Sequence, residues 1–316
     1  MTTSLFPAIK DIYPDAEIHT LTIPPAEVLL RNNPFISKRF VFDKKNSFFT
    51  KVKSFFSLVF KLRKEKYDIG MSVQHYLTNA LLMKFSNIKL KIGRTKMRFV
   101  DEKVYFPNKI HNRLRVLTLL EPLSKNVRQH DTHIYIDSES EDRIKSQLQT
   151  KDKNICIAPG SVWHTKKLPK YKFIEIIKLL KDYNIYLIGS PQETELCNEI
   201  MQEANHPSIY NFAGKLNLLE SSALVKNMDL MLCNDSAPLH IANAVETTVF
   251  AFFGPTIKDF ACFPYREQDK IIEIDLDCRP CGKHGAKSCP LKHHNCMEMI
   301  DVKSVVNSVN TFFLQR

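Results

Sequence analysis

The sequence predicts an α/β protein made of two lobes, each containing a parallel β-sheet. The chain has 316 residues, which suits two domains of about 150 residues each. Hydrophobic residues make up 44% and charged residues 25%, so each half can bury a core without disulfides or metal. Short apolar runs alternate with amphipathic stretches, which is typical of strands and helices in a parallel sheet. We therefore expect two α/β lobes facing a central cleft.

The second half shows this alternation most clearly. Its apolar runs are short and contain few polar residues, as expected for strands that are covered by helices on both faces of a sheet. The predicted strands are 154–158, 185–189, 208–212, 229–233 and 248–253, and the predicted helices are 171–182, 192–204, 217–227 and 237–245.

The first half repeats the pattern more weakly. We expect strands at 17–22 and 67–73 and helices at 48–64 and 78–85. An acidic run at 137–142 and a polar stretch at 147–154 place a domain boundary near 148–152. The predicted domains are therefore 1–150 and 151–316.

The charge balance predicts an acidic partner. The formal net charge is +11, which nucleic acid, an anionic membrane surface or a phosphorylated small molecule would each complement. No run of 18 apolar residues occurs, and the first residues lack the basic and apolar regions of a signal peptide. We expect a cytoplasmic protein.

Polar residues follow four of the predicted strands in the second half. In open α/β sheets ligands bind outside the carboxyl ends of the strands, so these residues are expected to form one site. Ser161 and Lys166 supply a hydroxyl and a cation for a diphosphate. Glu193 is placed to accept hydrogen bonds from ribose hydroxyls. The segment 235–238 has the small residues and the proline of a helix start, which favours anions.

Several residues at these strand ends also have a purely structural interpretation. Asp235 and Ser236 can cap the helix that follows them. His240 can be a half-buried histidine whose hydrogen bonds are satisfied, and Lys166 and Lys167 can be a solvated surface pair. No dinucleotide-binding glycine motif and no P-loop motif occur in the sequence, so neither a dehydrogenase nor a P-loop kinase is indicated.

Three segments in the second half resemble glycosyltransferase family 9, the ADP-heptose:lipopolysaccharide heptosyltransferases. Residues 159–169 (PGSVWHTKKLP) resemble that family's donor-phosphate loop. Residues 235–240 (DSAPLH) resemble its Asp-Thr-Gly-x-x-His signature and are followed by FGPT at 253–256. The cysteine-containing segment 278–297 also resembles many members.

The resemblance implies the GT-B fold, with two Rossmann-like lobes, the donor in the C-terminal lobe and the acceptor against the N-terminal lobe. It implies an inverting, metal-independent transfer of heptose from an ADP-sugar to the inner core of lipopolysaccharide, with no cofactor required. By position, Ser161 and Lys166 hold the diphosphate, Lys166 stabilises the leaving group, and Glu193 contacts the ribose. The residues that border the phosphates and the sugar are Asp235, Ser236, Ala237 and His240, of which Ser236 and Ala237 replace Thr and Gly.

The general base is not identified by the sequence. Inverting transfer needs a group that takes the proton of the acceptor hydroxyl. The resemblance places this carboxylate in a Gly-Asp loop after the first strand, and residues 1–10 resemble the helix that follows that loop. The base is therefore expected upstream of Met1, either because the start is internal to a longer gene or because this is a paralogue that binds donor without turnover. Asp11, Asp15 and Asp43 are substitutes only in principle.

Residues 44–66 form a basic, aromatic segment with eight Lys or Arg residues and the single Glu65. Its helical stripe contains Phe48, Val52, Phe55, Val59 and Leu62, widened by Phe49, Phe56 and Phe60. The stripe can face the core of the first lobe, or it can rest on the anionic inner face of the cytoplasmic membrane. A nucleic-acid partner is not expected, because these aromatic residues follow a helical stripe and not a basic groove.

A group of cysteines lies outside the predicted site. Cys278, Cys281, Cys289 and Cys296 lie close in sequence, with histidines between them. In a reducing compartment they are either ligands of a structural zinc ion or free thiols.

Overall fold

The computed structural model describes residues 1–43, 48–149 and 153–316. The chain divides into two compact units, Met1–Tyr135 and Ile136–Arg316. The boundary predicted at 148–152 lies partly outside the described residues, and the compact units divide earlier. The reason is helix α6 (Ser138–Lys145), which belongs to the second unit because Arg143 and Glu141 form ion pairs with Glu220 and Lys226.

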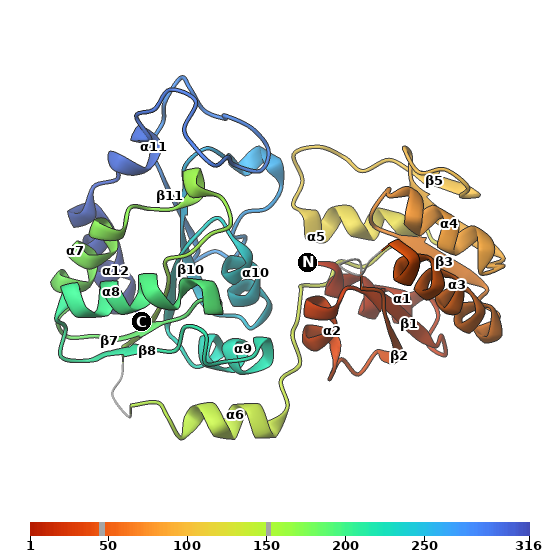
Figure 1. The fold of residues 1–316 in the computed structure, drawn as a ribbon, viewed down its shortest axis with the longest axis horizontal. Coiled ribbons are helices and arrows are strands. Elements are labelled where there is room, and N and C mark those ends of the chain that lie inside the picture. Colours follow the sequence, from red (N-terminus) through yellow and green to blue (C-terminus); the bar gives the residue numbers. More distant parts are fainter. Residues whose placement is uncertain (44–47, 150–152) are drawn as a thin grey trace. The chain divides into compact units, whose positions relative to one another are not determined.

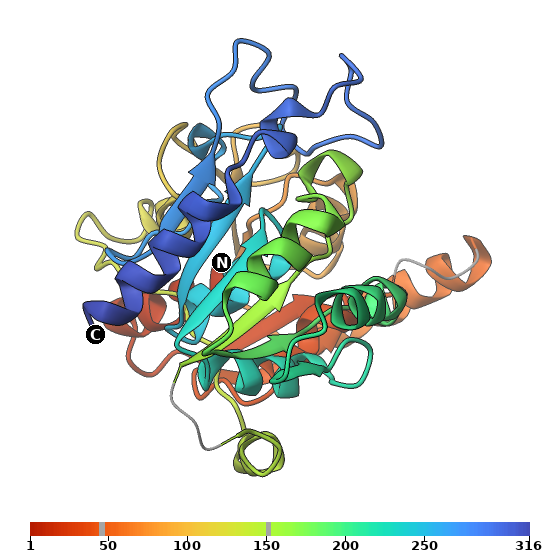
Figure 2. The same cartoon turned by 90° about the vertical axis from the view of Figure 1, so that its left-hand side faces the viewer.

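The second unit contains one six-stranded sheet in which every pairing is parallel (Figure 2). All five predicted strands are confirmed, and one further strand, β11, extends the sheet beyond β10. The spatial order is β11-β10-β9-β6-β7-β8. In chain order the strands are β6 (Asn154–Ala158), β7 (Asn184–Leu187), β8 (Ile209–Asn211), β9 (Leu230–Asn234), β10 (Thr248–Phe253) and β11 (Lys270–Glu273).

Helices cover both faces of this sheet (Figure 1). The four helices predicted for the second half are confirmed as α7 to α10, and the C-terminal helix α12 is additional. Helices α7, α8 and α12 pack on one face, and α9 and α10 lie on the other. Their bounds are α7 (Lys170–Leu179), α8 (Thr194–Ala204), α9 (Leu218–Lys226), α10 (Ala237–Ala244), α11 (Asn295–Glu298) and α12 (Val302–Leu314).

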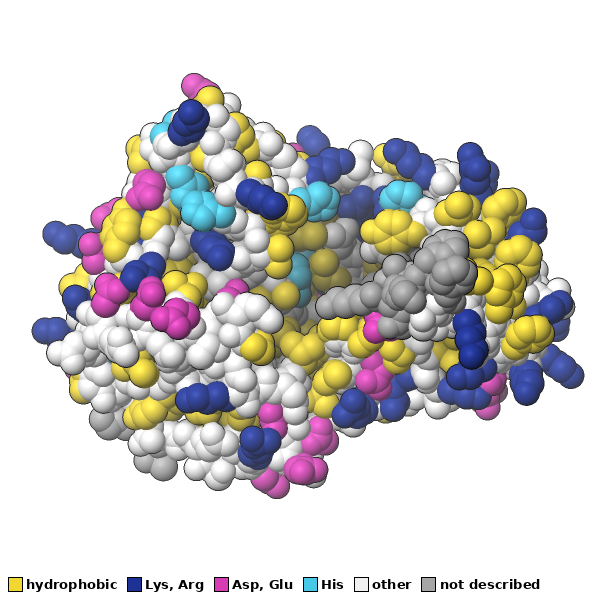
Figure 3. All heavy atoms as spheres, viewed as in Figure 1, with side chains coloured by type: hydrophobic (Ala, Val, Ile, Leu, Met, Phe, Trp, Pro, Cys, Tyr) yellow, Lys and Arg dark blue, Asp and Glu magenta, His cyan; other side chains and the backbone are white. Residues whose placement is uncertain are grey.

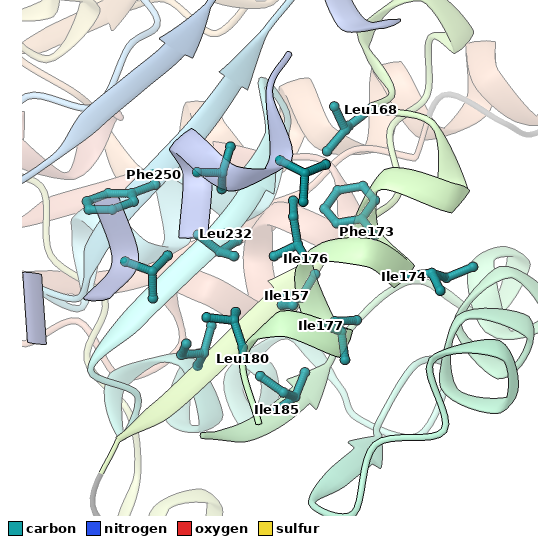
Figure 4. Packing of buried hydrophobic residues seen from close by; sticks show 14 of the residues in the cluster. Ile157, Leu168, Phe173, Ile174, Ile176, Ile177, Leu180, Ile185, Leu232 and Phe250 are labelled. Carbon is teal, nitrogen blue, oxygen red and sulfur yellow. The ribbon is translucent and has the colours of Figure 1, made fainter. Parts of the chain in front are cut away.

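The largest hydrophobic core lies between the sheet and the α7–α8–α12 layer (Figure 4). Phe173 of α7 meets Phe252 of β10 edge-to-face, with ring centroids 5.6 Å apart. Phe250 of β10 makes the same kind of contact with Phe312 of α12. These interlocking aromatic side chains fix the strands, and so they also fix the loops at the strand ends.

The first unit contains two small parallel sheets, and the two strands and two helices predicted there are confirmed. Strand β1 pairs only with β2, and β3 pairs only with β4, so β1 and β3 are both edge strands among the described residues. Residues 2–12 are helical, as expected from the resemblance of residues 1–10 to a helix of the family. The elements are η1 (Thr2–Ser4), α1 (Leu5–Ile12), β1 (Ile18–Thr22), α2 (Pro24–Leu30), β2 (Ile36–Val41), α3 (Phe48–Glu65), β3 (Ile69–Ser72), α4 (Leu77–Phe85), β4 (Leu90–Arg94), β5 (Glu102–Val104), α5 (Asn112–Arg115) and η2 (Val116–Leu120).

Among the described residues, no helix has the length and apolar character needed to span a bilayer.

Candidate functional site

Three strand ends of the second unit meet at one carboxylate. The Lys166 Nζ atom donates to Oδ2 of Asp235 at 2.5 Å, and the Thr256 hydroxyl donates to the same oxygen at 2.6 Å. These residues follow β6, β9 and β10, which are neighbours in the sheet. The side chains of Lys166 and Asp235 are 13% and 8% exposed, so the pair lies almost out of solvent. Such a pair persists only when hydrogen bonds satisfy its remaining groups, as Thr256 does here.

Asn234, the last residue of β9, joins two of these loops. Its side-chain amide donates to the carbonyls of Pro159 and Gly160 and accepts a hydrogen bond from the Leu168 backbone N–H at 2.9 Å. Asn234 is fully buried, so these bonds replace water that the amide has lost. Neither Asn234 nor Thr256 was among the residues predicted from the sequence. For Asn234 the available signal was a polar residue at the end of an otherwise apolar strand.

Glu193 lies against the loop that follows β6. Its carboxylate accepts hydrogen bonds from the backbone N–H and the hydroxyl of Ser190, at 2.7 and 3.0 Å. A Cβ atom on Gly160 would lie 1.7 Å from Glu193 Oε1, so any larger residue there would have to displace the Glu193 carboxylate. Ser161, directly after Gly160, is buried beside it. The predicted residues Ser161 and Glu193, which come from two different strand ends, therefore lie close together.

The start of α10 is not capped by a side chain. Ser236 is the N-cap residue, but its hydroxyl contacts the Asn234 carbonyl and not the first turn of the helix. The capping interpretation of Asp235 is wrong, because its carboxylate is held by Lys166 and Thr256. Ala237 is exposed in the first turn, and the partly exposed His240 follows one turn later. A helix start without a side-chain cap favours an anion.

The cysteine-containing segment packs on the loop that carries Lys166. The hydroxyl of Thr165 donates to the Ala286 carbonyl at 3.1 Å and accepts from the Ala286 N–H at 2.8 Å. His294 Nε2 lies 2.9 Å from the Thr165 carbonyl. Gly285 has a φ of +80°, and a Cβ atom there would lie 3.1 Å from Cγ of Lys166. These contacts, which the sequence analysis did not anticipate, hold Lys166 in place.

The four cysteines of this segment are all free thiols, with Cys296 buried and Cys281 exposed. Across residues 1–43, 48–149 and 153–316, no three His, Cys, Asp or Glu side chains are arranged to hold a metal ion. The structure thus supplies no ligand geometry for the predicted zinc. The thiols also differ chemically. Burial raises the pKa of Cys296 to about 11, whereas the pKa of Cys289 is lowered, because backbone N–H groups of residues 291–294 outweigh its partial burial.

The fold is that of an α/β protein of the GT-B class. The structure of Escherichia coli ADP-heptose lipopolysaccharide heptosyltransferase II has the same fold, with a TM-score of 0.80 and 20% sequence identity over 99% of this chain and 94% of that one. The model of glycosyltransferase family 9 (heptosyltransferase) matches residues 55–292, and the chain belongs to that family.

Two heptosyltransferases with similar sequences agree with this family assignment. A lipooligosaccharide heptosyltransferase 2 of Campylobacter jejuni is 28% identical over 230 residues, which are 71% of each chain. A lipopolysaccharide heptosyltransferase 3 of Escherichia coli is 28% identical over 274 residues, covering 81% of this chain and 80% of the relative. The family predicted from the three sequence motifs is confirmed.

Proposed function

We propose that this protein is a heptosyltransferase that transfers heptose from an ADP-sugar to the inner core of lipopolysaccharide. Its family and the names of its relatives support the sugar and the acceptor. The observation that carries the proposal is the meeting of Lys166, Asp235 and Thr256 at three neighbouring strand ends. A cation held at the edge of a parallel sheet, beside a helix start without a side-chain cap, is suited to a diphosphate.

The donor contacts follow from the chemistry of each group. Lys166 faces the diphosphate and stabilises the charge that develops on ADP as the glycosidic bond breaks. Asp235 holds Lys166 in position before the donor arrives. Ser161 and the first turn of α10 from Ala237 complete the anion contacts, and Glu193 accepts hydrogen bonds from the ribose. His240 borders the sugar.

The reaction we propose is inverting and needs no metal ion. In a single displacement the acceptor hydroxyl attacks the anomeric carbon from the face opposite ADP. Lys166 and the start of α10 supply the positive charge that a metal would otherwise supply. A general base must take the acceptor proton, and no residue of this chain is assigned to that role. Of the substitutes considered in the sequence, Asp11 accepts a hydrogen bond from His130 at 2.6 Å.

A second candidate function is donor binding without turnover, which is motivated by the unassigned base. Two measurements on the full chain separate the two. The first is calorimetric titration with ADP, and the second is transfer from ADP-heptose to a lipopolysaccharide acceptor that lacks the outer heptose. Binding with transfer supports the enzyme, and binding without transfer supports the second function. If ADP does not bind, both are wrong.

The same transfer reaction tests the proposed inversion and the proposed independence from metal ions. The configuration of the new glycosidic bond, read by nuclear magnetic resonance, should be the inverse of that in the donor. Addition of EDTA should leave the rate unchanged. We also propose that the protein acts in the cytoplasm, as expected from the sequence.

A further inference from the structure

Helix α3 is apolar on two faces. One face packs into the first unit, where Leu58, Val59 and Leu62 are buried against Phe40 and Phe42. This confirms the core-facing interpretation for part of the predicted stripe. The stripe as predicted was too wide, however, because Val52 is exposed. The side chains of 48 and 49 and all of residues 44–47 lie outside what the structure describes.

The second apolar face points to solvent. Val52, Phe56 and Phe60 are spaced four residues apart and so form one row along the helix. Phe56 is 52% and Phe60 is 62% exposed. A globular core explains neither of them. Large aromatic side chains that are exposed in a row indicate a surface that binds another protein or a membrane.

The row continues onto neighbouring elements. Phe55 contacts Phe56 and Phe85 edge-to-face, with ring centroids 5.6 and 6.4 Å away. Phe85, at the end of α4, is itself exposed, and the adjacent Lys84 places its ammonium 4.3 Å from the ring of the exposed Phe99. Figure 3 shows hydrophobic side chains gathered beside Lys and Arg over the part of the first unit that holds α3 and α4.

Unpaired positive charge borders this apolar surface. Lys53, Lys61 and Lys64 follow one another along α3 at helical spacing, and all three are exposed. None of the three forms an ion pair with a described residue. The acidic residue on α3, Glu65, forms its ion pair with Lys38 of β2 and not with these lysines. The row of lysines is therefore available to an anionic partner.

We propose that the outer face of α3, extended by Phe85 and Phe99, docks on an anionic lipid bilayer. An exposed helix with an aromatic row and a parallel basic row is the form that inserts its apolar side chains between headgroups while its lysines meet lipid phosphates. A second copy of this chain fits less well, because a two-fold contact would bring two basic rows together. This inference goes beyond the proposed activity and does not depend on it.

The test is vesicle flotation of the full chain with two lipid compositions. The wild type should float with vesicles of phosphatidylcholine mixed with phosphatidylglycerol and bind much less to phosphatidylcholine alone. The double variant Phe56→Gln/Phe60→Gln should bind the mixed vesicles about tenfold more weakly or worse. Each of Lys53→Gln, Lys61→Gln and Lys64→Gln should weaken binding about fivefold, and added salt should weaken the wild type.

A matched control is available on α7. Leu179 is 52% exposed, as Phe56 is, and lies beside the exposed Lys178 and Lys181. The triple variant Leu179→Gln/Lys178→Gln/Lys181→Gln should float as the wild type does. All variants change exposed side chains, so their melting temperatures should match the wild type. Equal flotation of the wild type and the Phe56→Gln/Phe60→Gln variant would overturn the proposal. So would a wild-type dimer, seen by sedimentation and dissociated by that variant, that does not bind vesicles.

Discussion

Lys166 and Asp235 lie 69 residues apart in the sequence, yet their charged groups meet at 2.5 Å and are largely shielded from water. The pair joins the loop after β6 to the loop after β9. It is held on one side by Thr256 and on the other by the segment that contacts Thr165. The structure of these loops and the proposed binding of the donor thus depend on the same few side chains.

The first prediction concerns the stability of this pair. Lys166→Ala leaves the Asp235 carboxylate nearly buried without its cation, so the free energy of unfolding should fall by about 3 kcal/mol. The double variant Lys166→Met/Asp235→Asn removes both charges and should regain much of that loss. Urea denaturation of the three proteins measures the difference. If Lys166→Ala is as stable as the wild type, the pair is exposed and mobile in solution.

The second prediction concerns Gly160. Gly160→Ala places a methyl group on Glu193 Oε1 and should displace that carboxylate, at a cost of about 1–3 kcal/mol in stability. Glu193→Ala in the same chain removes the clash but also the two hydrogen bonds from Ser190, so the double variant should recover only part of the lost stability. It should not recover ADP affinity if Glu193 contacts the ribose. Thermal melting with and without ADP follows both effects. A double variant that binds ADP as the wild type does would exclude Glu193 from the site.

The third prediction concerns the start of α10. Ala237 is exposed there, so Ala237→Leu should leave the melting temperature almost unchanged. It should abolish the upward shift that ADP causes, because the larger side chain fills the space where phosphate approaches the backbone. Lys303→Leu, at an exposed position in the first turn of α12, is the control and should keep the shift. An unchanged shift in Ala237→Leu would show that the helix start is only structural.

The fourth prediction concerns the segment that contacts the Lys166 loop. Thr165→Val removes the two hydrogen bonds that the hydroxyl makes with Ala286 and leaves the Ala286 N–H without this partner, whereas the Ala286 carbonyl still accepts from the backbone N–H of residue 165. We expect a loss of about 1–3 kcal/mol in stability and a weaker affinity for ADP, because Lys166 is then less well positioned. Thr165→Ser keeps the hydroxyl and should behave like the wild type. Equal ADP affinity in Thr165→Val and Thr165→Ser would limit the contact to a structural role.

The sequence predicted the elements of the second unit well because their apolar runs and helical stripes are regular. It missed β11, whose short apolar core is flanked by charged residues, and α12, whose many valines favour a strand. Packing of α12 on α7 outweighs that local preference. The domain boundary was placed late because a polar run does not show that α6 pairs with Glu220 and Lys226.

The site was predictable in outline and not in its contacts. The strand-end rule indicated Ser161, Lys166, Glu193 and the 235–240 segment, and the fold places them on one edge of the sheet. It could not indicate that Thr256 meets Asp235, because that contact depends on β9 and β10 being neighbours. Nor could helical spacing decide which apolar row of α3 faces the core, since both rows have the same period.

Calorimetric titration of the full chain with ADP tests the central claim most directly, when the wild type is compared with Lys166→Met/Asp235→Asn. That variant removes the cation proposed to meet the diphosphate while keeping the loop free of an unpaired charge. We predict saturable binding by the wild type and a loss of about 1.5–3 kcal/mol of binding free energy in the variant. Equal affinity in the two proteins, or no binding by the wild type, would contradict the assignment of this strand-end edge as the ADP-sugar site.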